Sequence, residues 1–467
     1  MKKKGKDMSK LIGNWKFYKR TLLIAVPVMI QNLITNFVAL LDNIMVGQIG
    51  TEQMSGVAIV NQLLFVFNLT IFGAASGAGI FCAQFFGKKD NDGIRYTFRF
   101  KLISLVVITL LGILIFMFFG ENLISMYLHD SQGGIDPVAT LGYAKSYISV
   151  MLVGLLPFSL EQVYSSTLRE GGMAMLPMIA GIVAVVTNMV FNYLLIFGVG
   201  PFPELGVVGA AIATVISRYV QLMIVVIWSH ANSIKLKFIK GVYKTLKIPK
   251  ELAKRIFTKG VLILTLNEGL WSLGVAVLMQ CYSVRGLDVV AGLNISNTVV
   301  NLFAVLYLAF GSGVSVVIGQ MLGANDLKGA KEAAPKLIFF AFMLCVAVGA
   351  VMAAFAKVFP EIYNTTDDVK NLATMFILIS AFIMPVNSAL HSTYFTLRSG
   401  GKTLITFIFD SGFSWLGSVP VAYCLAHFTN LDIFYVYLFT QLVEAVKLVV
   451  GIILINKGMW ISNIVNE

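Results

Sequence analysis

Long apolar segments follow one another along most of the sequence and are separated by short polar connections. Each is about as long as the roughly 20 residues that a helix needs to cross the hydrocarbon core of a bilayer. The pattern therefore predicts an all-α polytopic membrane protein with twelve transmembrane helices. They lie near residues 21–46, 54–80, 98–119, 140–166, 173–198, 206–230, 257–281, 288–318, 334–356, 371–397, 403–426 and 432–456.

The composition supports this interpretation and changes the meaning of the net charge. Of the 467 residues, 58% are hydrophobic and 12% are charged, and the mean hydropathy is +0.84. These values lie outside the range of soluble globular proteins. A net charge of +12 would suggest a nucleic-acid partner for a soluble protein. Here we expect a lipid bilayer as the partner, and no nucleic acid.

Positive side chains gather in every second connection. The connections after the second, fourth, sixth, eighth and tenth segments hold Lys88, Lys89, Arg95 and Arg99; Arg169; Lys235 to Lys259; Lys328, Lys331 and Lys336; and Arg398 and Lys402. The other connections hold only Arg285, Lys357 and Lys370. The positive-inside rule then predicts an even number of spans with both termini in the cytoplasm, in the plasma (inner) membrane.

The longest polar break is rich in lysine and divides the chain nearly in half. We interpret it as a cytoplasmic linker between two six-helix lobes. The predicted parts are a basic cytoplasmic tail at 1–20, an N-terminal lobe at 21–228, the linker at 229–256, a C-terminal lobe at 257–456 and a cytoplasmic tail at 457–467.

Two motifs occur once in each predicted lobe and in the same order. Gln84-Phe-Phe-Gly87-Lys-Lys-Asp90 matches Gln320-Met-Leu-Gly323-Ala-Asn-Asp326, and Thr167-Leu-Arg-Glu-Gly-Gly172 matches Thr396-Leu-Arg-Ser-Gly-Gly401. Such matches predict an internal repeat. Because each half has six spans, the repeat is parallel and its axis runs along the membrane normal. In this design the substrate binds between the lobes. Rocking of the lobes then opens the binding site alternately to the two sides of the membrane.

The first apolar segment contains Pro27, at which it can kink, and the carboxylate of Asp42. A carboxylate inside a spanning helix costs roughly 2.5–3.5 kcal/mol on insertion scales, so it usually faces a cavity and marks an ion or proton path. The alternative is that Asp42 lies near the outer headgroups and is merely solvated.

Three neutral polar residues in the fifth and sixth segments complete a candidate cation site. Asn188 and Asn192 are four residues apart and share one helix face, and Thr214 lies in the small-residue stretch GAAIATVIS. With Asp42 they provide the oxygen ligands that suit Na⁺, or they hold a carboxylate that carries a proton. The alternative is that they only join helices by hydrogen bonds.

The second predicted lobe has its own polar candidates. Glu268 lies near the middle of the seventh segment, Asp410 lies in the eleventh, and His391 lies beside Asn387 in the tenth. We expect Glu268, with Asp410 and His391 as further candidates, on the path of protons or cationic substrates. The alternative for Glu268 is a hydrogen-bonded structural role.

Four other charged residues are expected to have structural roles. Glu444 and Lys447 are three residues apart and are predicted to neutralise each other. Arg218 neutralises a carboxylate or extends toward water, and Glu161 lies at the membrane interface.

Enzyme motifs are absent from the sequence. There is no phosphate-binding GxxxxGK[ST], no HExxH and no paired His/Cys ligand spacing. We therefore expect neither an enzyme nor an ATP-driven pump, and no resident metal or cofactor.

With these residues in place, the chain resembles the multidrug and toxic compound extrusion (MATE) family over all twelve spans. The matching stretches are IAVPVMIQNL, LLDNIMVGQIGTEQMSGVA, AQFFGKKD, STLREGG, TNMVFNYLLIFG, GVVGAAIATVIS, GQMLGAND and FTLRSGG. The resemblance implies a 6+6 helical fold with a central cleft. It also implies export of organic, often cationic and lipophilic, compounds against inward movement of Na⁺ or H⁺.

The resemblance also assigns roles to residues. Pro27 and Asp42 stand where the family has its first-span proline and cation-site aspartate, Asn188 and Thr214 where it has ligands, and Glu268 where a seventh-span carboxylate is common. Two departures stand out. Many members have a second aspartate where this chain has Asn192, and some have an acidic residue inside the tenth span. Here Asp367 and Asp368 only precede that span.

The sequence thus predicts a secondary active transporter, a cation-coupled antiporter for small organic molecules that acts as a monomer. The alternatives are a related lipid-linked sugar or polysaccharide flippase, a membrane-embedded enzyme and a structural scaffold. The flippase should have an arginine-rich cleft, whereas Arg218 is the one arginine away from the ends of the predicted spans. The enzyme would need an acidic metal motif, and the scaffold would not need buried carboxylates.

Overall fold

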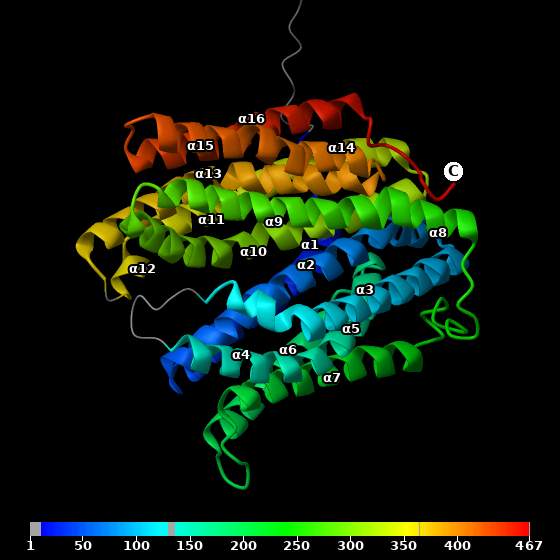
Figure 1. Cartoon of the computed structure of the whole chain (residues 1–467). Helices are drawn as coiled ribbons and strands as arrows, with labels where there is room; N and C mark the ends of the chain where they lie inside the picture. Colours follow the sequence, from blue (N-terminus) through cyan, green and yellow to red (C-terminus); the bar gives the residue numbers. More distant parts are fainter. Residues whose placement is uncertain (1–10, 129–135, 364, 467) are drawn as a thin grey trace, which may run out of the picture. The chain divides into compact units, whose positions relative to one another are not determined.

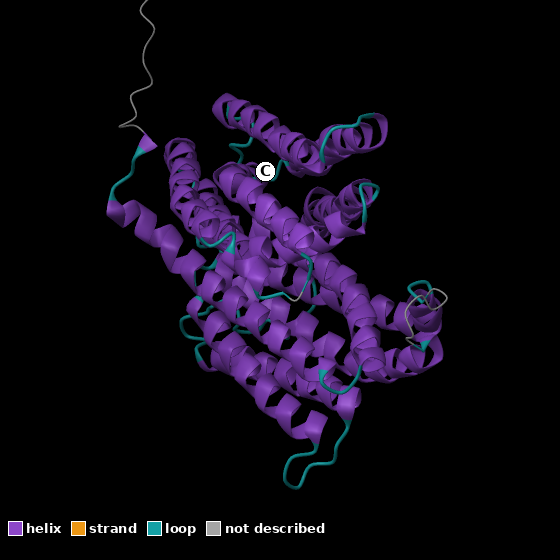
Figure 2. Cartoon of the chain, turned by 90° about the vertical axis from the view of Figure 1, so that its left-hand side faces the viewer, coloured by secondary structure: helices purple, strands orange, loops and turns teal. Residues whose placement is uncertain are grey.

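A computed structural model describes residues 11–128, 136–363 and 365–466, and these residues form helices joined by turns and short loops (Figure 2). Twelve helices in this part of the chain are long and apolar enough to cross a membrane. The predicted all-α fold with twelve spans is therefore confirmed. Residues 1–10 of the predicted N-terminal tail and residue 467 of the C-terminal tail lie outside the described residues.

In the first half (Figure 1), the first four spans extend beyond the predicted apolar segments at both ends, whereas α6 and α7 keep nearly the predicted bounds. Their bounds are α1 Trp15–Gly47, α2 Thr51–Lys88, α3 Asn91–Ser125, α4 Pro137–Met151, α5 Leu155–Glu170, α6 Met175–Phe197 and α7 Gly206–Ala231. The short 3-10 turn Leu152–Gly154 joins α4 to α5, so these two helices form the fourth span.

The second half is interrupted more often. Its helices are α8 Lys250–Ile256, α9 Leu262–Ser283, α10 Leu287–Gly323, α11 Leu327–Ala354, α12 Val358–Glu361, α13 Asp367–Ser399, α14 Thr403–Phe407, α15 Val419–Phe428 and α16 Ile433–Lys457. Segments with π-helical hydrogen bonding occupy Phe257–Val261, Ile408–Gly412 and Ser414–Ser418. Such segments are rare in proteins overall, but those that occur are often at functional sites.

The matched loop motifs have the same backbone geometry in both halves. Lys89 and Asn325, at equivalent positions, have the left-handed φ values of 60° and 63°. The next residues, Asp90 and Asp326, cap the N-termini of α3 and α11 by accepting backbone N–H groups of the first turn. The sequence repeat is therefore also a structural repeat.

The two copies of the first motif also contact each other reciprocally. A Cβ atom on Gly87 would lie 1.9 Å from the Gln320 carbonyl oxygen, and one on Gly323 would lie 1.8 Å from the Gln84 carbonyl oxygen. No side chain fits at these distances. The ends of α2 and α10 thus cross backbone to backbone, with each copy supplying the glycine that the other needs.

The described chain divides into two compact units. The N-terminal unit contains Ile30–Cys82 and Asp90–Phe257, and the C-terminal unit contains the described residues up to Met29, Ala83–Lys89 and the chain from Thr258 on. On α1 the boundary falls two residues after Pro27. Helices α1 and α2 therefore contribute residues to both units.

Close helix contacts in the N-terminal unit depend on glycines. A Cβ atom on Gly209 of α7 would lie 2.4 Å from the Leu195 carbonyl oxygen of α6. A Cβ atom on Gly181 of α6 would lie 2.9 Å from the amide nitrogen of Gln31 on α1. Small residues let helix backbones approach in this way in membranes. They bring α1, α6 and α7 together.

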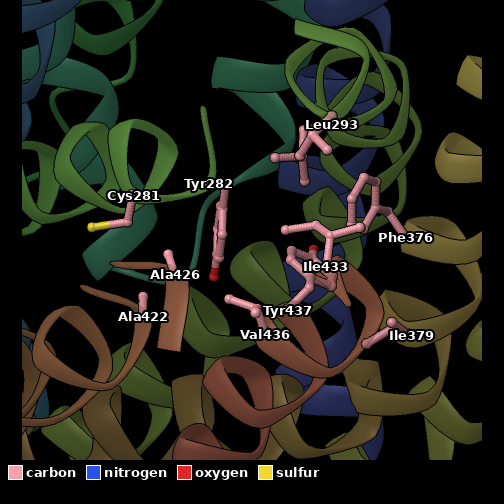
Figure 3. Close-up of a cluster of buried hydrophobic side chains, with 11 residues drawn as sticks. Cys281, Tyr282, Leu293, Phe376, Ile379, Ala422, Ala426, Ile433, Val436 and Tyr437 are labelled. Carbon is pink, nitrogen blue, oxygen red and sulfur yellow. The ribbon is translucent and has the colours of Figure 1, made fainter. Parts of the chain in front are cut away.

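The C-terminal unit has an apolar cluster formed by α9, α10, α13, α15 and α16 (Figure 3). The Tyr437 ring lies 4.8 Å from Phe376 and 5.5 Å from Tyr282, between ring centroids, in edge-to-face arrangements. The Tyr437 hydroxyl also bonds to the Ser380 hydroxyl at 3.0 Å. The cluster fixes α13 and α16 against each other within this unit.

Candidate functional site

Asp42 lies near the end of α1 in the N-terminal unit, and the asparagines of α6 face it. The Asn192 side-chain amide donates to Oδ1 of Asp42 and also to Oδ1 of Asn188 at 3.2 Å. The opposite end of the Asn188 amide lies 3.2 Å from the Thr214 hydroxyl. The structure thus brings together all four predicted residues, which we call the Asp42 site.

Helix geometry explains why these residues meet. The spacing from Gln31 to Asp42 on α1 equals the spacing from Gly181 to Asn192 on α6, and it is close to three turns of about 3.6 residues. Gln31 contacts Gly181 and Asp42 contacts Asn192. Both helices therefore keep the same faces toward each other over this distance.

The Asn188 amide fits between Asp42 and Thr214 in two orientations. In one, its oxygen faces the carboxylate and its nitrogen donates to the Thr214 hydroxyl. After a half-turn of the amide, its nitrogen lies 3.1 Å from both carboxylate oxygens and its oxygen accepts from Thr214. The first orientation gathers three oxygen atoms at one place, which is the arrangement a bound cation or proton stabilises.

Asn192, whose amide nitrogen donates to this arrangement, has an unpaired oxygen. Oδ1 of Asn192 is buried and has no hydrogen-bond partner within the part of the chain that the structure describes. Asn192 as a whole is 1% exposed. A buried carbonyl oxygen without a donor costs free energy unless a ligand binds it. The donor set of the Asp42 site therefore fits a small hard cation.

Asp410 lies in the π-helical segment Ile408–Gly412 of the C-terminal unit, and its main partner is a lysine. Nζ of Lys447 lies 2.8 Å from Asp410 Oδ1 and 3.7 Å from Glu444 Oε2. Lys447 is 2% exposed. The prediction that Glu444 and Lys447 simply neutralise each other is therefore incomplete, because the eleventh span supplies the closer carboxylate.

Glu268 connects to Asp410 through neutral groups. Glu268 interacts with the Tyr394 hydroxyl and with the charge of Arg398. The Asn267 side chain donates to Asp410 at 3.0 Å and to the Tyr394 hydroxyl at 3.2 Å. These residues, together with Glu444 and Lys447, form what we call the Asp410 network.

Arg398 is a member of this network that the sequence did not indicate. We placed it among the loop charges, but it is 4% exposed at the end of α13. Its guanidinium lies 4.9 Å from the Phe395 ring centroid and 3.5 Å from the Tyr394 hydroxyl. Its place in the repeated FTLRSGG motif gave no indication of burial.

His391 and Pro27 lie outside the hydrogen bonds of these two sites. His391 Nδ1 is 3.0 Å from the Asn387 carbonyl oxygen, and its ring lies 4.9 Å from the Tyr307 ring. Pro27 is buried within α1, which continues through it.

Glu161 and Arg218 are two further charged residues for which the sequence predicted a role. Glu161, which we expected at the membrane interface, is 2% exposed within the protein and accepts hydrogen bonds from Ser165 and, at 3.1 Å, from Gln221. These donors compensate for its burial. Arg218 donates to the Gly154 carbonyl oxygen at 3.1 Å, so the partner that the described residues give it is a backbone carbonyl and not a carboxylate.

Comparisons with known proteins agree with the fold. A sequence model of the MatE family matches residues 27–194 and 267–424. Similar curated proteins include the "Probable multidrug resistance protein NorM" of Thermotoga maritima, 25% identical over 425 residues (89% of this chain and 87% of that protein). The "Probable multidrug resistance protein YoeA" of Bacillus subtilis is 25% identical over 418 residues (88% and 87%).

A solved structure has the same fold. It is described as the outward-facing conformation of a multidrug resistance MATE family transporter of the MOP superfamily. The TM-score is 0.80 at 20% sequence identity, and the match covers 97% of this chain and 98% of that chain.

Proposed function

Because the chain belongs to the MatE family of multidrug and toxic compound extrusion transporters, we propose that it is a cation-coupled efflux antiporter that works by alternating access. It exchanges Na⁺ or H⁺ for small organic compounds that are cationic and lipophilic. It works as a monomer in the plasma membrane, with both termini in the cytoplasm. The relatives' names as multidrug resistance proteins support the transport of several compounds.

One observation carries the coupling proposal: the partners that the structure gives Asp42 are neutral amides. A carboxylate in a membrane helix needs a compensating positive charge or a proton. No fixed cation is among these partners, so the charge comes from solution. This makes Asp42 the group that takes up and releases the coupling ion.

The Asn188 amide supplies a response to the ion. When Na⁺ binds between the carboxylate and the amide oxygen, Asn188 keeps its oxygen toward Asp42 and its nitrogen toward Thr214. A proton on Asp42 favours the same orientation, because the acid then donates to the amide oxygen 3.1 Å away. Loss of either ion favours the turned amide, whose N–H group donates to the carboxylate.

This change is transmitted through helix contacts. Thr214 is on α7, which contacts α6 closely at Gly209, and Pro27 interrupts the hydrogen-bond ladder of α1 before Asp42. Ion binding thus biases the packing of α1, α6 and α7 and favours one side of access. In the C-terminal unit, Glu268 and Asp410 lie on the path of the cationic substrate, and His391 is a further candidate for proton transfer there.

The test is transport in proteoliposomes under separately imposed Na⁺ and H⁺ gradients. We expect a fluorescent organic cation to be exchanged under one of the two gradients by the wild-type protein, and Asp42→Asn to abolish that exchange. Asp432→Asn is the matched control, because Asp432 caps α16 and asparagine caps a helix equally well.

Two results would contradict the proposal. If the wild-type protein exchanges the cation equally well without either gradient, the transport is not ion-coupled. If Asp42→Asn keeps gradient-driven exchange at the control level, the coupling ion binds elsewhere.

A further inference from the structure

The segment between α7 and α8 does not run freely between the halves but is bound to α3. The Arg99 guanidinium donates to the backbone carbonyl oxygens of Gly241, Val242 and Lys247 at 3.0, 2.8 and 3.1 Å. Arg99 is 5% exposed. One buried arginine thus holds three carbonyl groups of the segment in a fixed arrangement.

A second arginine and several apolar side chains extend this attachment. Arg95, one turn before Arg99, donates to the Phe238 carbonyl oxygen at 3.1 Å. Four apolar residues of the segment are directed inward and are at most 4% exposed, while Ile234 and Leu246 stay exposed; the buried four are Leu236, Phe238, Ile239 and Val242. The segment therefore has an ordered surface in the N-terminal unit.

This attachment forms a pocket of about 290 Å³ at the end of α7. Its polar lining residues are His230, Ser233, Lys240, Tyr243 and Lys244. The His230 and Tyr243 rings stack with centroids 5.8 Å apart. The Tyr164 hydroxyl bonds to both of them, at 3.1 Å to His230 Nε2. These hydrogen bonds therefore fix the positions of the His230 and Tyr243 rings at the edge of the pocket.

The charge around the pocket has one sign. The lining includes no acidic residue, and the sequence has none between Glu204 and Glu251. Lys240 and Lys244 are exposed, as are Lys235, Lys237 and Lys247 in the same segment. A concave site with two lysines, a serine hydroxyl and an imidazole favours a phosphate group.

We propose that this pocket binds the phosphate group of an anionic phospholipid, with Lys240 and Lys244 as its principal contacts. The source of the phosphate follows from position: His230 belongs to the last turn of the membrane-spanning helix α7, and Ser233 follows its end. Both residues thus lie at the depth of the lipid headgroups. Basic pockets at such helix ends are suited to anionic headgroups.

The site is separate from the Asp42 site and does not depend on the proposed antiport. Its consequence is a preference for acidic membranes. An anionic lipid bound there links the end of α7 to the segment that α3 holds, and so stabilises the N-terminal unit by ligand binding to the folded state.

The experiment is native mass spectrometry of the purified full-length protein titrated with short-chain phosphatidylglycerol, and in parallel with phosphatidylcholine. We expect preferential binding of phosphatidylglycerol. The double variant Lys240→Gln/Lys244→Gln should weaken it by roughly thirtyfold, the scale expected for two lost lysine contacts. The double variant Lys235→Gln/Lys250→Gln is the matched control, since it removes the same charge from exposed positions outside the pocket lining.

Three results would overturn the proposal. Equal weakening in both double variants would mean diffuse attraction to the whole segment rather than a pocket. Equal binding of both lipids to the wild-type protein would exclude an anionic headgroup.

A third arm of the experiment uses glycerol phosphate and inorganic phosphate. If they bind at the Lys240/Lys244 pocket and phosphatidylglycerol does not, the ligand is a soluble phosphate and not a lipid.

Discussion

The two units treat a membrane-embedded carboxylate in opposite ways. In the N-terminal unit, Asp42 has neutral amide partners, and one of these, Asn192, has a buried oxygen to which none of the described residues donates. In the C-terminal unit, Asp410 has a lysine at 2.8 Å. The Asp410 network thus contains its own positive charge, and the described partners of Asp42 do not supply one. On the proposed function, the Asp42 site takes that charge from solution, which places ion coupling in the N-terminal unit.

The internal repeat makes the comparison sharper. Arg218 follows Gly172 at the spacing at which Lys447 follows Gly401, so the two basic residues occupy equivalent positions. Arg218 donates to a backbone carbonyl oxygen and lies over the Phe158 ring at 5.1 Å, while Lys447 lies against Asp410. The repeat thus preserves a basic position but changes its partner.

At another pair of equivalent positions, the N-terminal unit has the buried ion pair and the C-terminal unit has neutral partners. Glu170 in the first copy of the second motif binds the buried Lys101 at 2.6 and 2.7 Å. Its counterpart Ser399 bonds to the backbone and hydroxyl of Ser315. The repeat therefore fixes the backbone, and each unit has its own arrangement of charge.

The largest expected effect is from removal of the built-in cation. Lys447→Met leaves Asp410 and Glu444 without their counter-charge and should destabilise the protein by roughly 3–5 kcal/mol, the usual cost of breaking a buried ion pair. The thermal unfolding midpoint in detergent measures this effect.

A second substitution tests the cause. Adding Asp410→Asn to Lys447→Met should restore much of the lost stability, because it removes the nearer of the two uncompensated charges. If the double variant is as unstable as Lys447→Met alone, the lysine acts by packing, and the contrast between the two units disappears.

A smaller effect should follow when the Asp42 site gains a second carboxylate. Asn192→Asp places a further negative charge next to Asp42, so we expect tighter Na⁺ binding by about tenfold, or about 1.4 kcal/mol. The concentration of Na⁺ that gives half-maximal exchange in proteoliposomes measures the change. Asn188→Asp is the comparison within the same helix face. Unchanged or weaker Na⁺ dependence in Asn192→Asp would mean that this oxygen does not face the ion.

The smallest effect is expected at Thr214. Thr214→Val removes the hydroxyl that holds the far end of the Asn188 amide, at a cost of about 0.5–1.5 kcal/mol for one hydrogen bond. Half-maximal exchange should therefore require several-fold more coupling ion. Ser217→Ala is the control, because its hydroxyl bonds only to the Thr214 carbonyl oxygen among the described residues. Equal shifts in both variants would show a general effect on α7.

Sequence reasoning succeeded where a single segment determines the outcome. The bilayer requires long apolar helices, so the twelve spans were predictable. Asp42 and the asparagine pair were also predictable within their own segments, because Asp42 is a carboxylate in an apolar segment and Asn188 and Asn192 share a helix face. That they meet across α1, α6 and α7, together with Thr214, was expected from the oxygen ligands of a cation site and from the family resemblance.

Sequence reasoning failed for two residues whose partner or burial is determined by tertiary packing. Glu444 lies three residues from Lys447 and was the obvious partner, but tertiary packing of α16 against the π-helical segment gives Lys447 a closer one in Asp410. Arg398 belongs to a loop motif by sequence, yet α13 continues far enough to bury it. No periodic pattern contains this information.

The reciprocal contact of Gly87 with Gln320 and of Gly323 with Gln84 restricts how the polypeptide can be divided. A fragment that ends in the linker would retain Gly87 and lose the backbone that fits against it, and the complementary fragment would be left with the matching defect. Each half of this duplicated chain therefore needs the other in order to fold. A protein that is split at the linker should fold only when both fragments are expressed in the same cell.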